Sequence, residues 1–213
     1  MDTEAVLFDM DGVVVDTEEF WRDREANVVL PESVASGDPT QDEIRGINYR
    51  ETYDYLAERY EMALDRDEFL ELYEAAAEEL YGERAELLPG FRELLATLQE
   101  RGVKTAIVSS SPHSWLELVV ERFDLDVDAV VSTEDVNGPG KPAPDVYEYA
   151  ARTLGVAPEA CLAVEDSPNG VRAATRAGTT CIAYGGDPEA SSLADVSVDS
   201  PADLRASVEA QTT

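Results

Sequence analysis

Short apolar runs alternate with helical patterns along most of this chain, and that alternation limits the possible folds more than any other feature. The runs are of strand length and rich in aliphatic or β-branched residues: Ala5–Phe8, Ala106–Val108, Ala129–Val131, Leu162–Val164 and Cys181–Tyr184. Between most of them, apolar residues recur at helical spacing. Strands that alternate with helices predict an α/β fold, with a parallel sheet, right-handed crossovers and helices on both faces.

The helices of this pattern carry their own start and stop signals. Phe91, Leu94, Leu95 and Leu98 lie on one predicted helix face, and Gly102 follows as a C-terminal cap. A later stripe is formed by Val146, Tyr149, Ala150, Thr153 and Leu154, and Gly155 ends it. Ser167 and Pro168 predict an N-cap and a first helical residue, and Gly178 closes that helix.

Residues 17–82 break the alternation, because they show no convincing strand. Asp65 and Glu68 have the spacing of a capping box, and an apolar helical stripe follows them. We therefore expect a helical insertion at 17–82 after the first strand, with residues 1–16 and 83–213 forming the α/β core. Near the end of the core, Val196 and Val198 predict a weak edge strand, followed by a short helix.

The charge of the chain excludes several classes of partner. Asp and Glu total 46 against 16 Lys and Arg, which gives a formal net charge of -30. Such a charge repels nucleic acid and anionic membranes, so we expect neither as a partner. Only Lys104 and Lys141 are lysines. An acidic, lysine-poor folded protein is typical of salt-loving (halophilic) organisms, and an ordinary acidic enzyme is the alternative.

Other residue types bear on the compartment. Cys161 and Cys181 both lie in apolar stretches and suit core positions in a reducing compartment. No apolar run approaches the roughly 18 residues of a membrane helix, and the start of the chain is acidic where a signal peptide is basic. We expect a cytoplasmic protein that is a monomer or a weak homo-oligomer.

Polar residues follow the predicted strands at the points where each strand ends. Asp9 follows the first run, Ser109 to Ser111 follow the second, and Glu165 and Asp166 follow the fourth. Lys141 lies in the loop after the third run. Because ligand sites of open parallel sheets lie at the carboxyl ends of the strands, these side chains should share one edge of the sheet.

The chemistry of these side chains fits phosphoryl transfer. Several close carboxylates cannot all stay ionised without a cation, and oxygen ligands suit Mg²⁺. Asp9, Asp11, Asp166 and Glu165 are therefore the candidate metal residues, while Ser109, Ser110 and Lys141 are the candidates to hold the phosphoryl group. Asp9 could attack the phosphorus atom, and Asp11 could serve as acid and base.

Four motifs in order resemble the haloacid dehalogenase-like hydrolases, in their phosphatase and β-phosphoglucomutase-like branch. They are DMDGVVVDTE, VSSSP, GKPAPD and VEDSPNGVRAATRAG, within residues 5 to about 184. The resemblance implies a Rossmann-like core with a helical cap, and Mg²⁺ held by Asp9, the Asp11 carbonyl and Asp166, with Glu165 nearby. It also implies that Asp9 is the nucleophile. Dehalogenating members lack the second aspartate, so Asp11 favours phosphoryl chemistry.

Three functions remain open. The first is a Mg²⁺-dependent phosphatase that hydrolyses a small phosphorylated metabolite, its expected binding partner. The second is a β-phosphoglucomutase-like phosphomutase, although Trp21 and Tyr49 stand where those enzymes have His and Arg. A signalling receiver domain is the remote third.

Substrate contacts are expected on the insertion, at Arg45, Gly46, Asn48, Tyr49 and Arg50; the alternative is that these residues form ordinary surface. Ser111 is expected to cap the helix that begins near Pro112.

Overall fold

The computed structural model describes residues 2–44 and 47–212, and the chain divides into two compact units. One unit comprises Met1–Asp16 with Glu86–Thr213, and the other is Thr17–Ala85. The second unit extends past Gly82 because its last helix continues there as a π-helical turn, η2 (Leu80–Arg84).

The first unit is built on a six-stranded sheet in the order β10-β9-β8-β1-β6-β7. All neighbouring strands in it pair in parallel, which confirms the predicted α/β fold. The strands are β1 (Ala5–Phe8), β6 (Lys104–Ser109), β7 (Ala129–Ser132), β8 (Cys161–Glu165), β9 (Thr180–Tyr184) and β10 (Val196–Val198). Strand β1 lies between β6 and β8, and the chain builds the sheet outward from it in both directions.

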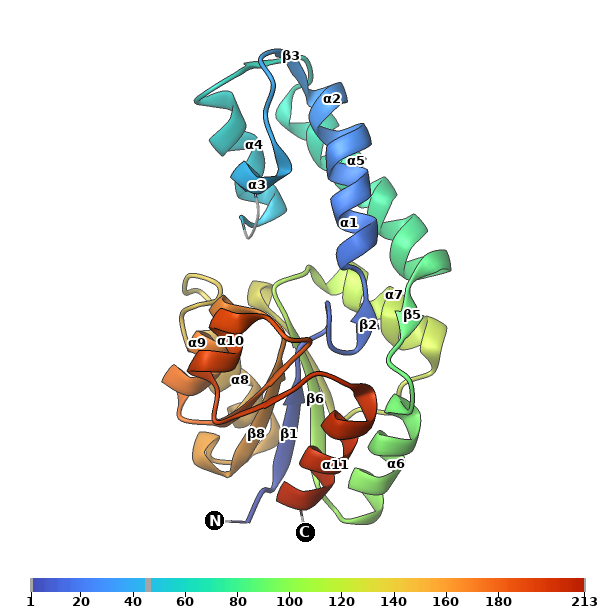
Figure 1. Ribbon diagram of the computed structural model, residues 1–213, viewed down its shortest axis with the longest axis vertical. Coiled ribbons are helices and arrows are strands. Elements are labelled where there is room, and N and C mark those ends of the chain that lie inside the picture. Colours follow the sequence, from blue (N-terminus) through green and yellow to red (C-terminus); the bar gives the residue numbers. More distant parts are fainter. Residues whose placement is uncertain (1, 45–46, 213) are drawn as a thin grey trace. The chain divides into compact units, whose positions relative to one another are not determined.

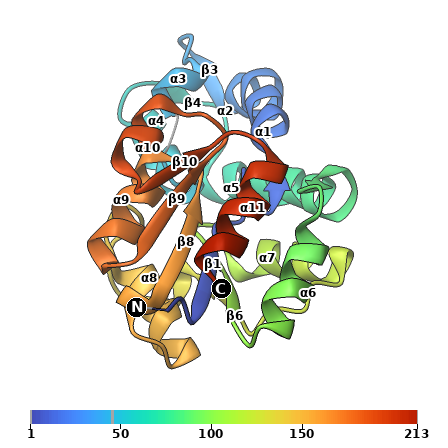
Figure 2. The same ribbon diagram turned by 60° about the horizontal axis from the view of Figure 1, so that its bottom comes forward.

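Helices cover both faces of this sheet, as Figures 1 and 2 show. One face carries α6 (Phe91–Glu100), α7 (His113–Phe123) and α11 (Pro201–Gln211), and the other carries α8 (Asp145–Leu154), α9 (Pro168–Ala177) and α10 (Pro188–Leu193). Short 3₁₀ turns η3 (Thr133–Asp135) and η4 (Pro158–Ala160) precede α8 and β8. The three layers follow from right-handed crossovers, which place successive helices on one face until the direction of the sheet reverses.

Alternation along the central strand separates the two halves of the core. Ala5 and Leu7 are buried in the cluster that also contains residues of α8 and α9. Phe8 points the other way, and its ring meets that of Phe91 edge-on with centroids 5.0 Å apart. With a period of two residues, the next side chain after Leu7, that of Asp9, is sent toward the α8 face.

The helix signals of the sequence are largely confirmed. The Ser167 hydroxyl accepts a hydrogen bond from the Gly170 N–H, Pro168 is the first residue of α9, and Gly178 ends that helix with a left-handed backbone. The predicted stripe on α8 was partly wrong: Thr153 is exposed, whereas Tyr149 is partly buried and packs against the core as expected. Tyr147 and Ala151 are fully buried, although neither was predicted to belong to the stripe.

The second unit is mostly helical. Its elements are α1 (Glu18–Arg24), the π-helical turn η1 (Glu25–Val29), α2 (Leu30–Ser33), β3 (Val34–Ser36), α3 (Gln41–Ile44), α4 (Tyr49–Ala57), β4 (Glu61–Met62), α5 (Arg66–Glu79) and η2. The expectation that this region lacks strands was wrong, because β3 and β4 form a short antiparallel pair. A pair this short has too few residues to show an alternating pattern.

Aromatic rings form the centre of the second unit. Tyr73 on α5 lies 5.3 Å from the Phe69 ring, 5.5 Å from the Tyr49 ring and 5.6 Å from the Trp21 ring, measured between centroids. Asp65 and Glu68 form the predicted capping box at the start of α5.

In the first unit, β2 (Val15–Asp16) pairs in antiparallel fashion with β5 (Glu86–Leu87) where the chain leaves and re-enters the core. Within the described part of the chain, every helix is too short or too polar to cross a bilayer.

Candidate active site

The candidate site lies at the carboxyl ends of the three central strands. Asp9 follows β1, Ser109 ends β6, and Glu165 ends β8. Strand β1 pairs with β6 on one side and with β8 on the other, so these three positions are neighbours. The strand order reverses at this point, because the chain adds strands on one side of β1 first and on the other side afterwards. Open α/β sheets bind their ligands at such a point.

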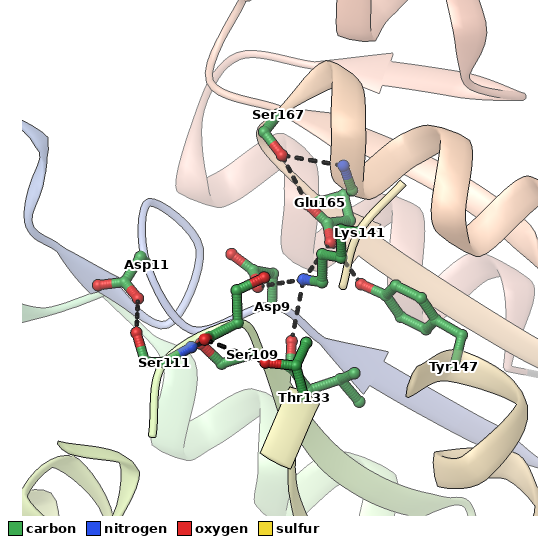
Figure 3. A network of polar contacts seen from close by, with 12 residues as sticks. Asp9, Asp11, Ser109, Ser111, Thr133, Lys141, Tyr147, Glu165 and Ser167 are labelled. Carbon is green, nitrogen blue, oxygen red and sulfur yellow. Dashed lines mark hydrogen bonds and ion pairs between the residues drawn. The ribbon is translucent and has the colours of Figure 1, made fainter. Parts of the chain in front are cut away.

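Lys141 joins the carboxylates of this edge. Its Nζ donates to Asp9 Oδ1 at 2.5 Å, to Glu165 Oε1 at 2.6 Å and to the Val108 carbonyl at 3.1 Å (Figure 3). The side chains of Lys141, Asp9 and Glu165 are 7%, 10% and 0% exposed. An ion pair so well shielded from water is strongly coupled, because the local dielectric is low. The structure thus brings together the predicted nucleophile, the predicted phosphoryl-binding lysine and Glu165.

Glu165 is held from several sides. Its Oε1 also accepts a hydrogen bond of 2.5 Å from the Tyr147 hydroxyl, and its Oε2 accepts one of 3.4 Å from Ser167 Oγ (Figure 3). Its carboxylate lies against the first turn of α9, where a Cβ on Gly170 would overlap it. Only glycine leaves room for the carboxylate at this place.

The loop after Asp9 depends on another glycine. Gly12 has φ of +80°, in the left-handed region that favours glycine. A Cβ at that position would overlap the Asp166 carboxylate. Gly12 therefore lets the loop carrying Asp11 approach Asp166 closely.

The carboxylates exceed the positive charge available to them. Burial raises the pKa of Asp9 well above its ordinary value; Lys141 opposes this shift, while Glu165, Asp166 and Asp11 add to it. Burial followed by repulsion from Glu165 raises the pKa of Asp166 to about 8. By contrast, burial lowers the pKa of Lys141, but attraction to Asp9 and Glu165 outweighs it and the net pKa is raised. One ammonium group does not neutralise this cluster.

The donor set fits a divalent cation. Among the described residues, Asp9, Glu165 and Asp166 offer carboxylate oxygens that all lie within 4.8 Å of one another. Carboxylate oxygens without sulfur or imidazole suit a hard ion such as Mg²⁺. The fourth predicted metal residue, Asp11, lies outside this group of three. Its Oδ2 accepts a hydrogen bond of 3.1 Å from Ser111 Oγ.

The serine loop after β6 differs in part from the prediction. Ser109 is 1% exposed, and its hydroxyl oxygen accepts from the Ser111 N–H at 3.0 Å. Ser110 is exposed. The expectation that Ser111 caps the following helix was wrong, because Pro112 is the N-cap residue of α7 and Ser111 turns its hydroxyl to Asp11.

The predicted contacts on the insertion are distributed differently. Arg45 and Gly46 lie outside the described residues. The Asn48 side chain accepts from the Arg50 N–H and caps α4. Tyr49 is 9% exposed, and its hydroxyl donates to Glu74 Oε1 at 3.0 Å. Arg50 is exposed, with its guanidinium 5.2 Å from the centroid of the Tyr49 ring.

Several residues that support the loops of the site were not among the predicted site residues. Ser132 Oγ donates to the Ser111 carbonyl at 2.7 Å, and Thr133 Oγ1 donates to the Ser110 carbonyl at 3.2 Å. These residues come directly after the Ala129–Val131 run, so the rule that identified the other strand ends applies to them too. Tyr147 was also missed, although it lies three and four residues before the apolar Ala150 and Ala151.

Comparison with known proteins identifies the family. The family model of the haloacid dehalogenase-like hydrolases matches residues 3–178. Hexitol phosphatase B of Escherichia coli (strain K12) is 36% identical over 221 residues, covering 95% of this chain and 94% of that protein. Beta-phosphoglucomutase of Bacillus subtilis (strain 168) is 29% identical, covering 85% and 83%. The chain belongs to the haloacid dehalogenase-like hydrolases, as its motifs predicted.

A solved structure supports the same grouping. The crystal structure of a CbbY variant from Rhodobacter sphaeroides, in complex with xylulose-(1,5)bisphosphate, has a TM-score of 0.79 and 27% sequence identity. The alignment covers 95% of this chain and 96% of that one. The family match and the phosphatase relative confirm the prediction of an enzyme that hydrolyses phosphate monoesters. These matches give no support to the receiver domain.

Proposed function

We propose that this chain is a Mg²⁺-dependent phosphatase that hydrolyses a small phosphorylated sugar or sugar alcohol through a phosphorylated Asp9. The observation that carries the proposal is the convergence of Asp9, Lys141 and two further carboxylates at the reversal point of the sheet. The hexitol phosphatase relative and the sugar bisphosphate bound in the CbbY structure support the choice of substrate class.

In the proposed reaction, an Asp9 carboxylate oxygen attacks phosphorus and the bond from phosphorus to the ester oxygen breaks. The electron pair stays on the ester oxygen, which takes a proton from the Asp11 carboxyl group and leaves as an alcohol. A water then attacks the phosphorylated Asp9 and gives a proton to Asp11. The bond between phosphorus and Asp9 breaks, which regenerates the carboxylate and releases inorganic phosphate.

The other residues bind and orient the phosphoryl group. Lys141, whose Nζ lies against Asp9, would hold a phosphoryl oxygen, and Ser109 and the exposed Ser110 would hold others. Asp9, Asp166 and Glu165, with the Asp11 carbonyl, would hold Mg²⁺. The bound ion would offset the charge of the carboxylates and of the phosphoryl oxygens.

We also propose that Thr17–Ala85 is the cap domain of this enzyme and that it selects the substrate. Among the described candidates, Arg50 is the exposed cation. Asn48 and Tyr49 have roles inside their own unit, as a helix cap and as a buried aromatic residue. Replacing Arg50 by Ala is therefore the first substitution to test for a change in substrate preference.

The proposed nucleophile can be tested directly. Replacing Asp9 with Asn should lower kcat for p-nitrophenyl phosphate in Mg²⁺ by a factor on the order of 10³ or more, because the attacking carboxylate is lost. The fold should persist, as measured by circular dichroism. Replacing the exposed Asp2 with Asn is the matched control and should leave kcat unchanged. Turnover near wild type in the Asp9→Asn variant would remove Asp9 as the nucleophile.

The phosphomutase is the second candidate, because beta-phosphoglucomutase is among the relatives. At the two positions where mutases have His and Arg, Trp21 donates to the Tyr81 hydroxyl oxygen at 3.2 Å and Tyr49 donates to Glu74. Neither supplies a cation for a second phosphate. Incubation with β-glucose 1-phosphate separates the functions, since a phosphatase releases inorganic phosphate and a mutase forms glucose 6-phosphate.

A further inference from the structure

Tyr147 contacts two members of the site without being one of its reacting groups. It lies in the first turn of α8 and is 0% exposed. Its hydroxyl donates to Glu165 Oε1 at 2.5 Å, and the centroid of its ring lies 5.2 Å from Lys141 Nζ (Figure 3). Strand alternation explains the meeting, because Ala163 and then Glu165 point to the sheet face that α8 covers.

Lys141 is fully occupied in this arrangement. An ammonium group has three N–H donors, and those of Lys141 point to Asp9, Glu165 and the Val108 carbonyl. To bind a phosphoryl oxygen, Lys141 must therefore release one of these acceptors. The acceptor it releases is left in a place where water cannot easily replace the lost hydrogen bond.

Of the two carboxylates, Glu165 would be the more costly to release, since its side chain is 0% exposed and that of Asp9 is 10% exposed. A buried charge that loses its partner is strongly destabilised. Here Oε1 accepts from both Lys141 and Tyr147, so it keeps a hydrogen bond when the lysine turns away. In this structure the face of the Tyr147 ring lies beside the ammonium group, and such a face attracts cations.

We infer that Tyr147 is a positioning residue of the phosphatase: its hydroxyl holds Glu165 in place and frees Lys141 to bind the phosphoryl group. The inference rests on the proposed function. It assigns Tyr147 no contact with substrate, and its action passes through Glu165. If Tyr147 only filled space, its ring would matter, but the effect of removing its hydroxyl would not depend on the charge of Glu165.

Replacing Tyr147 with Phe removes the hydroxyl and keeps the ring. Binding of inorganic phosphate to the protein in Mg²⁺, measured by titration calorimetry, should weaken about tenfold, the effect typical of losing one hydrogen bond to a charged group. Hydrolysis of p-nitrophenyl phosphate should lose a similar factor in kcat/KM. Tyr149→Phe, which removes a hydroxyl from a partly buried tyrosine on the same helix, is the control and should change each quantity less than twofold.

A double-mutant cycle distinguishes positioning from packing. In the Glu165→Gln background the charge that Tyr147 is proposed to hold is absent, so adding Tyr147→Phe should change phosphate affinity less than twofold. Packing alone would give the same loss in both backgrounds, because independent effects add. Denaturant unfolding of the wild type and the three variants gives the same coupling without ligand, which keeps the test valid if Tyr147→Phe is destabilised.

Two results would overturn the inference: phosphate affinity of wild-type strength in Tyr147→Phe, or equal losses in the two backgrounds. The proposed function fails separately. If the wild-type protein neither binds inorganic phosphate in Mg²⁺ nor hydrolyses phosphate esters, then the site itself has been misassigned.

Discussion

Four carboxylates and one ammonium group lie at the end of β1, and their electrostatics govern how single residues behave. Burial first, and then neighbouring carboxylates, raise the pKa of Asp9 and of Asp166, the latter to about 8. In the unfolded chain these groups titrate near pH 3.9. Between those values the metal-free folded state binds more protons than the unfolded state. Stability should therefore fall as pH rises, whereas a carboxylate in an ordinary ion pair makes stability rise with pH.

This difference predicts that the metal-free protein loses stability as pH rises from about 4 to about 8. Urea unfolding in EDTA at pH 5, 6.5 and 8 should show a falling midpoint. The Asp166→Asn variant lacks one of the carboxyl groups with a raised pKa, so its urea midpoint should fall less steeply with pH. Mg²⁺ should raise the midpoint most at pH 8, because it binds the deprotonated carboxylates. A urea midpoint in EDTA that stays constant or rises over this pH range would contradict the statement that the excess of buried carboxylates destabilises the metal-free protein.

At the scale of elements, the start of α9 is shaped around Glu165. Replacing Gly with Ala inside a helix usually stabilises by about 0.5–1 kcal/mol. Gly170→Ala should instead destabilise, because its Cβ would overlap a carboxylate that Lys141 and Tyr147 hold in place. Gly140→Ala is the control, since its Cβ would meet only the Thr133 methyl at an ordinary 3.6 Å. Denaturant unfolding that shows Gly170→Ala to be the more stable of the two would refute the packing argument.

The strands and the site could be predicted because their signals are local in the sequence. Each apolar run marked a strand of the sheet, and the polar residue after it marked the shared edge, where Asp9, Ser109 and Glu165 now lie together. Periodicity failed where an element was too short, as in β3 and β4.

Features that depend on packing between distant segments could not be predicted in this way. Ser111 has the composition of a helix cap, yet it faces Asp11 from a loop 100 residues away. Tyr147 lies outside the predicted apolar stripe of its helix, and its hydroxyl partner Glu165 becomes visible only when α8 packs on the sheet. The close approach at Gly12 likewise involves Asp166, far along the chain.

At the scale of the whole molecule, the net charge of -30 opposes folding, because like charges are closer together in the compact state than in the unfolded chain. Ion pairs cannot remove this repulsion, since 16 basic residues face 46 acidic ones. Salt can reduce it: the screening length falls from about 10 Å at 0.1 M to about 3 Å at 1 M ionic strength.

We therefore predict that Tm rises between 0.1 M and 2 M KCl. Each 1 kcal/mol of relief corresponds to roughly 2–4 °C for a chain of this size, so a relief of only a few kcal/mol is readily measured by scanning calorimetry. Sucrose at matched water activity separates screening from the general exclusion of solutes. Repeating the series at pH 4.5, where many surface carboxylates are partly protonated, should reduce the KCl effect. If KCl raises Tm equally at pH 4.5 and at neutral pH, self-repulsion of the acidic surface does not limit the stability of this protein.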